Sequence, residues 1–188
     1  MENLQSIADR WSSPSLSDKG TTHSYISHYE SLFEPYRKLP VTLLEVGVKS
    51  GASIRMWNEY FVSEDKKIIG VDIILGRPYQ VDLNFPHISL FKGSATDKTF
   101  MSQFEDIDIF IDDGSHELND QLCTMELMLP KIRKGGVYVI EDIDLSNEET
   151  ARRFEDLHKS GKGNLLDLRN ERPDSVLPSF NNMYFMKL

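Results

Sequence analysis

Two short apolar runs rich in β-branched residues each end in paired carboxylates, and a histidine closely follows one pair. The runs read I-D-I-F-I-D-D-G-S-H (residues 107–116) and V-Y-V-I-E-D-I (residues 137–143). In an open parallel sheet, ligands collect outside the carboxyl ends of the strands. Two neighbouring strands with such ends would place carboxylates and an imidazole around one crevice, as in a hard-cation site with a base beside it. The groups concerned are Asp112, Asp113 and His116 after the first run, and Glu141 and Asp142 after the second.

A glycine turn follows an earlier apolar run, and its spacing is typical of a ligand-binding strand-to-helix turn. Glu45, Gly47 and Gly51 form the pattern E-x-G-x-x-x-G. Gly47 permits a tight turn and a close backbone approach to a ligand, and Gly51 lets the next helix begin near the strand. Exposed N–H groups at such a helix start favour a carboxylate or a phosphate. The spacing differs from the G-x-G-x-x-G of dinucleotide enzymes, and an ordinary turn is the alternative interpretation.

A single carboxylate, Asp72, ends the next apolar run, I-I-G-V-D. It lies roughly 20 residues beyond the glycine turn, which is the usual offset for an acid that binds both hydroxyls of a ribose. A solvated strand-end aspartate is the alternative, but the turn and Asp72 together favour a ligand that carries a nucleoside. Further along, F-K-G-S-A-T-D places Ser94 and Ala95 where they could line an adenine edge.

The elements that must position these groups alternate between strand and helix. We predict a doubly wound α/β fold, with a Rossmann-like, mostly parallel seven-stranded sheet and helices on both faces. We expect the chain to form one domain over residues 1–188, with a helical cap at 1–40 and a Rossmann-like core at 41–188. Lys134–Gly136 is expected to stop the helix before the fifth strand. The predicted strands are Thr42–Val46, Lys67–Asp72, His87–Phe91, Ile107–Asp112, Gly136–Glu141, Asn164–Leu168 and Met183–Lys187. The predicted helices include His23–Arg37, Ser53–Phe61, Asp97–Phe104, Asn119–Leu129 and Asn147–Lys159.

Bulk properties limit the partners that this chain is expected to have. A net charge of −9 over 188 residues disfavours a nucleic-acid binder, which would normally carry a basic stripe. No apolar run approaches the ~18 residues of a membrane span, and the first residues lack the basic and apolar regions of a signal peptide. We therefore expect a cytoplasmic protein that binds neither nucleic acid nor membrane. The sequence leaves the oligomeric state open, a homo-oligomer included.

With these motifs in this order, residues 41–188 resemble the class I S-adenosylmethionine-dependent methyltransferases. The runs I-D-D-G-S-H and V-I-E-D-I, with the polar opening S-D-K-G-T-T-H-S-Y, resemble the metal-dependent O-methyltransferases of the macrocin and mycinamicin sugar type, and related cephalosporin hydroxylase-like proteins. The resemblance implies S-adenosyl-L-methionine and Mg²⁺ or Mn²⁺ as cofactors. It also implies metal-assisted methylation of a hydroxyl on a small molecule, with a sugar or a vicinal diol favoured.

The same resemblance assigns roles to individual residues. In that family, the second aspartate of the D-D-G-S-H run and the Glu-Asp pair after the fifth strand bind the metal, which corresponds here to Asp113, Glu141 and Asp142. The general base corresponds to His116. The cofactor contacts correspond to Glu45, Gly47, Gly51, Asp72, Ser94, Ala95 and Asp112. Ser94 departs from the pattern, because many methyltransferases carry an acidic residue there toward the adenine amine.

Other interpretations stay open at this point. His116 could instead cap the helix that follows it, and the Glu-Asp pair could be a solvated strand end. Lys19 and Tyr25 could cover the methionine end of the cofactor, Trp57 is expected to be a packing residue, and His23 belongs to no obvious cluster. For the chain as a whole, the alternatives are a cofactor-binding partner module without catalysis and a hydroxylase-like oxidoreductase on the same fold.

Overall fold

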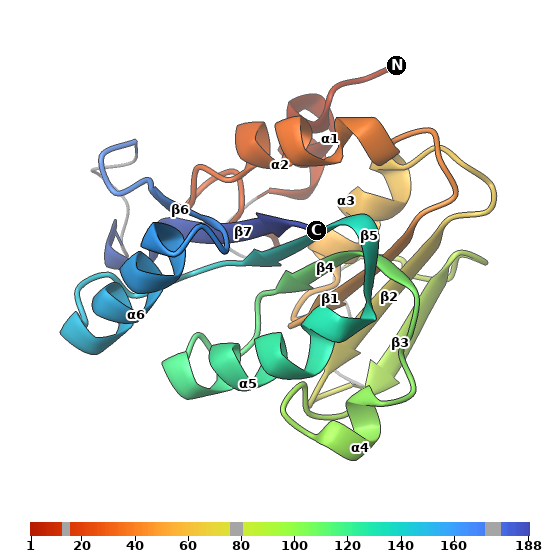
Figure 1. Ribbon diagram of the computed structural model, residues 1–188. Coiled ribbons are helices and arrows are strands. Elements are labelled where there is room, and N and C mark those ends of the chain that lie inside the picture. Colours follow the sequence, from red (N-terminus) through yellow and green to blue (C-terminus); the bar gives the residue numbers. More distant parts are fainter. Residues whose placement is uncertain (13–15, 76–80, 172–177) are drawn as a thin grey trace.

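The computed structural model describes residues 1–12, 16–75, 81–171 and 178–188. A seven-stranded sheet runs through the molecule in the order β3-β2-β1-β4-β5-β7-β6 (Figure 1). The pairings among the first five strands are parallel, whereas β7 runs antiparallel to both of its neighbours. The strands are β1 (Thr42–Val46), β2 (Lys67–Asp72), β3 (Ile88–Lys92), β4 (Ile107–Asp112), β5 (Ile132–Ile140), β6 (Asn164–Asp167) and β7 (Asn182–Lys187).

Helices cover both faces of this sheet, because successive strand residues point to opposite sides. Ile109 and Ile111 of β4 belong to a core that also holds residues of α1, α2 and α3. Phe110, between them, belongs to a second core with residues of α4, α5 and α6. The helices are α1 (Leu4–Trp11), α2 (Ile26–Phe33), α3 (Ala52–Tyr60), α4 (Lys98–Met101), α5 (Leu118–Met128) and α6 (Glu148–Lys159). Short 3-10 turns occupy Glu34–Tyr36, Leu129–Lys131 and Pro178–Phe180. The predicted doubly wound α/β fold is confirmed.

The strand that carries the second carboxylate pair begins earlier than predicted. The expectation that Lys134–Gly136 stops the preceding helix was wrong: α5 ends at Met128, and a 3-10 turn containing Pro130 leads into β5 at Ile132. The β4–β5 register then shifts, because Ile107 pairs with Ile132 whereas Ile109 pairs with Val137. Gly135 has a φ of +83° within this irregular stretch. The glycines therefore serve a bulge inside the strand.

Two predicted helices are shorter in the structure. Over the predicted 97–104 helix, only Lys98–Met101 is α-helical, and the Asp97 side chain caps it by accepting from the Thr99 and Phe100 amides. Over the predicted 23–37 helix, α2 begins only at Ile26 and gives way to a 3-10 turn at Glu34. The residues before α2 are thereby left as a loop, which the site uses.

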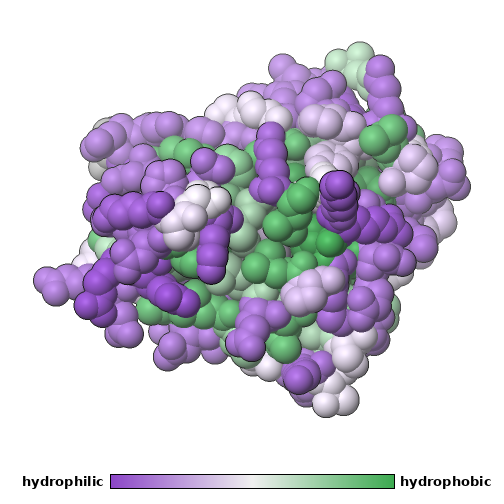
Figure 2. All heavy atoms as spheres, viewed as in Figure 1, coloured by the Kyte–Doolittle hydropathy of each residue, from purple (hydrophilic) through white to green (hydrophobic). Residues whose placement is uncertain are grey.

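Helices α1 and α2 pack on the same face of the sheet as α3 (Figure 1). Over the described residues, no helix is long and apolar enough to cross a membrane. Figure 2 shows hydrophilic residues around the periphery of one face, and hydrophobic ones gathered near its middle, where Figure 1 shows the strands.

Candidate active site

A cavity of about 480 Å³ lies at the carboxyl ends of the parallel strands. Its volume falls within the range of ~300–1,000 Å³ that is common for small-molecule sites. Most of the predicted site residues line it, namely Gly47, Asp72, Ser94, Ala95, Asp112, Asp113, His116 and Asp142. Glu45, Gly51 and Glu141 are not among the described residues that line this cavity. As expected for parallel strands, whose carboxyl ends meet at one edge of the sheet, the ends of β1, β2, β3, β4 and β5 border one cavity.

The turn after β1 requires its first glycine. Gly47 has a φ of +90°, and a Cβ atom there would lie 1.8 Å from the carbonyl oxygen of Asp113. Backbone hydrogen bonds also tie this turn to its neighbours. The Gly47 amide donates to the Val71 oxygen of β2 at 2.8 Å, and the Asp113 amide donates to the Val46 oxygen of β1 at 3.1 Å. The glycine turn and the D-D-G-S-H loop thus meet backbone to backbone at the cavity. Gly51 (φ +84°) precedes α3 as its N-cap.

Asp72 fixes this turn while also lining the cavity. Its Oδ2 accepts from the Val48 and Lys49 amides at 2.9 and 3.0 Å, and its Oδ1 accepts from the Ile74 amide at 2.8 Å. A carboxylate has about four acceptor positions, so Asp72 keeps one for a ligand hydroxyl. Ile73 and Ile74 follow it at the cavity rim with 64% and 47% of their surface exposed, and they form an apolar wall.

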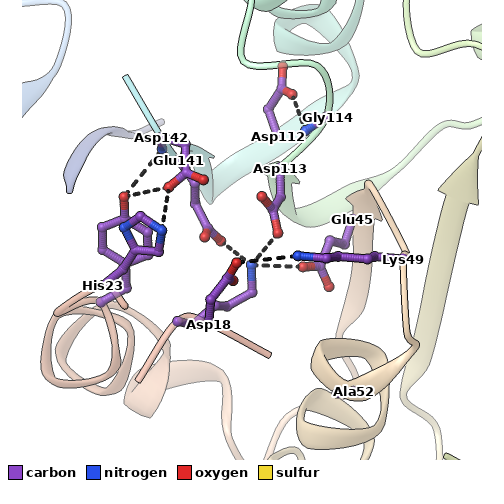
Figure 3. A network of polar contacts seen from close by, with 12 residues as sticks. Asp18, His23, Glu45, Lys49, Ala52, Asp112, Asp113, Gly114, Glu141 and Asp142 are labelled. Carbon is purple, nitrogen blue, oxygen red and sulfur yellow. Dashed lines mark hydrogen bonds and ion pairs between the residues drawn. The ribbon is translucent and has the colours of Figure 1, made fainter. Parts of the chain in front are cut away.

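Asp112 is a buried acid with an unsatisfied oxygen. The residue is 3% exposed, and its Oδ1 accepts from the Gly114 amide at 3.3 Å. No described residue donates to its Oδ2. Burial raises the pKa of Asp112 to about 7, against the Gly114 hydrogen bond. Buried polar atoms normally have partners, so this oxygen at the cavity suits a ligand donor. Figure 3 shows Asp112 turned toward Gly114 and away from the other acids.

The predicted metal-binding acids are held by residues from the loop before α2 and from α2. The ammonium of Lys19 lies 2.6 Å from Asp113 Oδ2 and 2.6 Å from Glu141 Oε1. The Tyr29 hydroxyl also donates to Glu141 Oε1, and the Tyr25 hydroxyl donates to Asp142 Oδ1 at 2.7 Å. Burial raises the pKa of Glu141 well above its ordinary value, and burial together with Asp113 raises that of Asp142 to about 7.

Glu45 belongs to this cluster and not to the cavity wall. It is fully buried, accepts a hydrogen bond from Trp57 Nε1 at 2.9 Å, and lies 3.2 Å from the Lys19 ammonium. Figure 3 shows Glu45, Asp113 and Glu141 pointing toward one another. Burial raises the pKa of Glu45, and Lys19 opposes the rise. Trp57 is a packing residue, as predicted, with a polar contact besides.

His116 stands between two cavities. It lines the large one and also a second of about 330 Å³, whose described wall includes Glu117, Asp144 and Phe180. Its Nε2 lies 3.7 Å from Asp142 Oδ2, and its buried Nδ1 meets no donor or acceptor in the part of the chain that the structure describes. His116 and Asp142 have φ values of +63° and +54°. Such backbone conformations concentrate at functional sites.

Sequence reasoning missed most of the contribution of the first 30 residues. Lys19 and Tyr25 contact the acids, and neither lines the large cavity in the described structure. Tyr29 was not singled out at all. His23, which belonged to no predicted cluster, is 2% exposed, stacks on Tyr25, and has its Nε2 3.5 Å from Asp142 Oδ1. The only available signal was the polar segment S-D-K-G-T-T-H-S-Y, which has no local periodicity.

The donors present fit a hard divalent cation. Oxygen or nitrogen atoms of Asp113, His116 and Asp142 lie within 4.8 Å of one another, and so do those of Glu45, Asp113 and Glu141. The second group surrounds the Lys19 ammonium. The first group borders the cavity. Carboxylate oxygens with room for further oxygen ligands suit Mg²⁺ or Mn²⁺.

Comparisons with known proteins agree with this arrangement. A curated relative from Streptomyces olivaceus, 8-demethyl-8-alpha-L-rhamnosyl tetracenomycin-C 2'-O-methyltransferase, is 32% identical over 165 residues, which are 78% of this chain and 42% of the relative. Mycinamicin VI 2''-O-methyltransferase from Micromonospora griseorubida is 31% identical over 75% of this chain and 36% of its own. The chain therefore spans less than half the length of these curated relatives.

The fold has a close counterpart among solved structures. The MycE methyltransferase from the mycinamycin pathway, solved with Mg, SAH and mycinamycin VI, superimposes with a TM-score of 0.73 at 22% identity, over 99% of this chain and 53% of that one. A model of the methyltransferase domain family matches residues 44–143, which hold both carboxylate pairs and the glycine turn. The resemblance inferred from the sequence is thus confirmed, and the chain belongs to the methyltransferase domain family, with the fold of the class I enzymes.

Proposed function

We propose that this chain transfers a methyl group from S-adenosyl-L-methionine to a hydroxyl of a small molecule, with a sugar or a vicinal diol favoured. One observation carries the proposal: a single cavity combines the Gly47 turn, Asp72 and Asp112 with Asp113, Asp142 and His116. The first three suit a nucleoside-bearing cofactor, and the last three suit a hydroxyl that must lose a proton. The curated relatives support the same conclusion, because they are named as O-methyltransferases of a rhamnosyl tetracenomycin and of mycinamicin VI.

The cofactor would lie across the ends of β1, β2 and β3. Asp72 would accept from a ribose hydroxyl, Ser94 and Ala95 would face the adenine, and Ile73 would cover it. The Gly47 turn would admit the methionine portion close to the backbone. Asp112 Oδ2, which lacks a protein donor in the described structure, would accept from a donor group of the cofactor.

Asp113, Glu141 and Asp142 would hold the divalent cation through the oxygens that Lys19 and Tyr25 do not occupy. A cation bound there lowers the pKa of a coordinated hydroxyl. His116 takes the proton of the acceptor at a ring nitrogen, and Asp142, 3.7 Å away, stabilises the resulting imidazolium. S-adenosyl-L-methionine, when bound, would supply the methyl group, and its carbon–sulfur bond would break as the acceptor oxygen bonds to that carbon, which leaves S-adenosylhomocysteine.

The acceptor would enter by the second cavity, which shares His116 with the first. Its described lining carries the acids Glu117, Asp144 and Glu149 and no lysine or arginine. An anionic acceptor would be repelled there, so the charge distribution favours an uncharged, hydroxylated molecule. Phe180 offers an apolar surface on the same wall.

Calorimetry and a turnover screen test the proposal. S-adenosylhomocysteine should bind, and methyl transfer to glycosides or diols should occur with Mg²⁺, disappear in EDTA and return when Mg²⁺ is restored. Absence of cofactor binding at millimolar ligand would refute the proposal. Full activity in EDTA would refute only the metal requirement. Cofactor binding with no turnover against a broad hydroxylated panel would favour a binding module.

A further inference from the structure

We propose that Lys19 is a positioning residue for the cation site, which fixes the orientation of Asp113 and Glu141 by holding one oxygen of each. This inference rests on the proposed metal site but not on methyl transfer itself. Lys19 is 1% exposed, and its Nζ lies 2.6 Å from Asp113 Oδ2 and 2.6 Å from Glu141 Oε1. Both distances are those of charge-assisted hydrogen bonds.

The ammonium selects one oxygen from each acid. Among the described residues, Asp113 Oδ1 and Glu141 Oε2 accept no hydrogen bond, whereas their partner oxygens are held by Lys19. Asp142 shows the same division, because Tyr25 holds Oδ1 and leaves Oδ2 facing His116. Each acid therefore keeps one oxygen for the protein and one for a ligand. Groups that orient metal ligands in this way commonly contribute 10- to 100-fold to metal affinity.

Lys19 stays charged in this position. Burial disfavours its ammonium, but the carboxylates of Asp113, Glu141 and Glu45 outweigh that effect and raise the pKa of Lys19 well above its ordinary value. A fixed positive charge beside a cation site repels the cation. Charge alone therefore predicts that Lys19 weakens metal binding, whereas positioning predicts that Lys19 strengthens it. The two roles have opposite signs and can be separated.

The test is a Mn²⁺ titration followed by electron paramagnetic resonance, on wild-type protein, Lys19→Met and the double variant Lys19→Met/Glu45→Gln. The single variant makes the cluster one charge more negative, and the double variant restores the wild-type charge. We expect both variants to bind Mn²⁺ about 10- to 100-fold more weakly than wild type. In the single variant Lys19→Met, S-adenosylhomocysteine affinity should stay within about threefold, because Asp72 and Asp112 do not contact Lys19.

The matched control is Lys131→Met, which removes a largely buried ammonium bound to the Met101 and Phe104 carbonyls, away from the cavity. Its Mn²⁺ affinity should equal that of wild type. Unchanged or tighter Mn²⁺ binding in either Lys19 variant would overturn the proposal, as would an equal loss of cofactor and metal affinity. Loss of the folded state in both would overturn it too, because Lys19 would then serve the fold. Mn²⁺ binding by wild type without any methyl transfer would refute the proposed function and leave this inference standing.

Discussion

Replacing Asp112 by asparagine should stabilise the protein at neutral pH and weaken its ligand binding. Asparagine has the same shape and keeps the acceptor for the Gly114 amide, but it cannot ionise. The carboxyl group of Asp112 is buried, with one oxygen that no described residue contacts. Ionising it in the folded protein is therefore costly, and the variant removes that cost.

The size of the effect follows from the pKa. Burial raises the pKa of Asp112 from 3.8 to about 7, and each pKa unit corresponds to about 1.4 kcal/mol. Between these two values the folded state binds more protons than the unfolded state, so wild-type stability falls as the pH rises. The stability difference between variant and wild type should therefore grow from near zero below pH 4 to about 4 kcal/mol above pH 7.

Urea denaturation of both proteins at pH 4, 6 and 8, in chelator and without cofactor, measures this difference. Other buried acids titrate in both proteins, so their contributions cancel at each pH. In parallel, S-adenosylhomocysteine affinity should fall about 10- to 100-fold if Asp112 accepts a hydrogen bond from the cofactor. Parallel stability curves for the two proteins across this pH range would refute the reasoning about Asp112.

Three further substitutions test other parts of the site. Gly47→Ala puts a Cβ atom 1.8 Å from the Asp113 oxygen at a φ of +90°, so urea denaturation should show a loss above about 3 kcal/mol; an unchanged midpoint would contradict the backbone geometry. His116→Ala should lower turnover about 10²- to 10⁴-fold with cofactor affinity intact, and unchanged turnover would remove His116 from the mechanism. Trp57→Phe deletes the donor to buried Glu45 and should cost about 1–3 kcal/mol of unfolding free energy; equal stability would show that this hydrogen bond contributes nothing net.

The part of the site that sequence reasoning could place is the part that depends on strand ends. Apolar runs that stop at Asp72, Asp112 and Glu141 mark where parallel strands terminate, and parallel strands terminate at one edge. β1, β2 and β4 accordingly occur with the predicted bounds. The start of β5 could not be predicted, because its pairing with β4 includes a register shift that only the partner strand determines.

The sequence pattern could not predict the direction in which the side chains at these strand ends point. Glu141 and Asp142 are adjacent, yet Asp142 lines the cavity and Glu141 turns into the Lys19 cluster. The Glu45 side chain on β1 likewise points away from the cavity and accepts a hydrogen bond from Trp57. Glu141 turns this way because Lys19 and Tyr29 bind its carboxylate. The sequence pattern near residue 141 cannot indicate a buried ammonium that comes from a segment far away in the chain.

The contacts that hold the acids have a consequence for how the molecule folds. Lys19 reaches Asp113 and Glu141 across 94 and 122 residues, and Tyr25 reaches Asp142 across 117. Contacts at such sequence separation close late, since a long loop must lose its entropy first. During synthesis, Glu45 is available to Lys19 early, but Asp113, Glu141 and Asp142 are not available until they have left the ribosome. We therefore expect the sheet to assemble before the site, and the loop before α2 to be the last piece to dock.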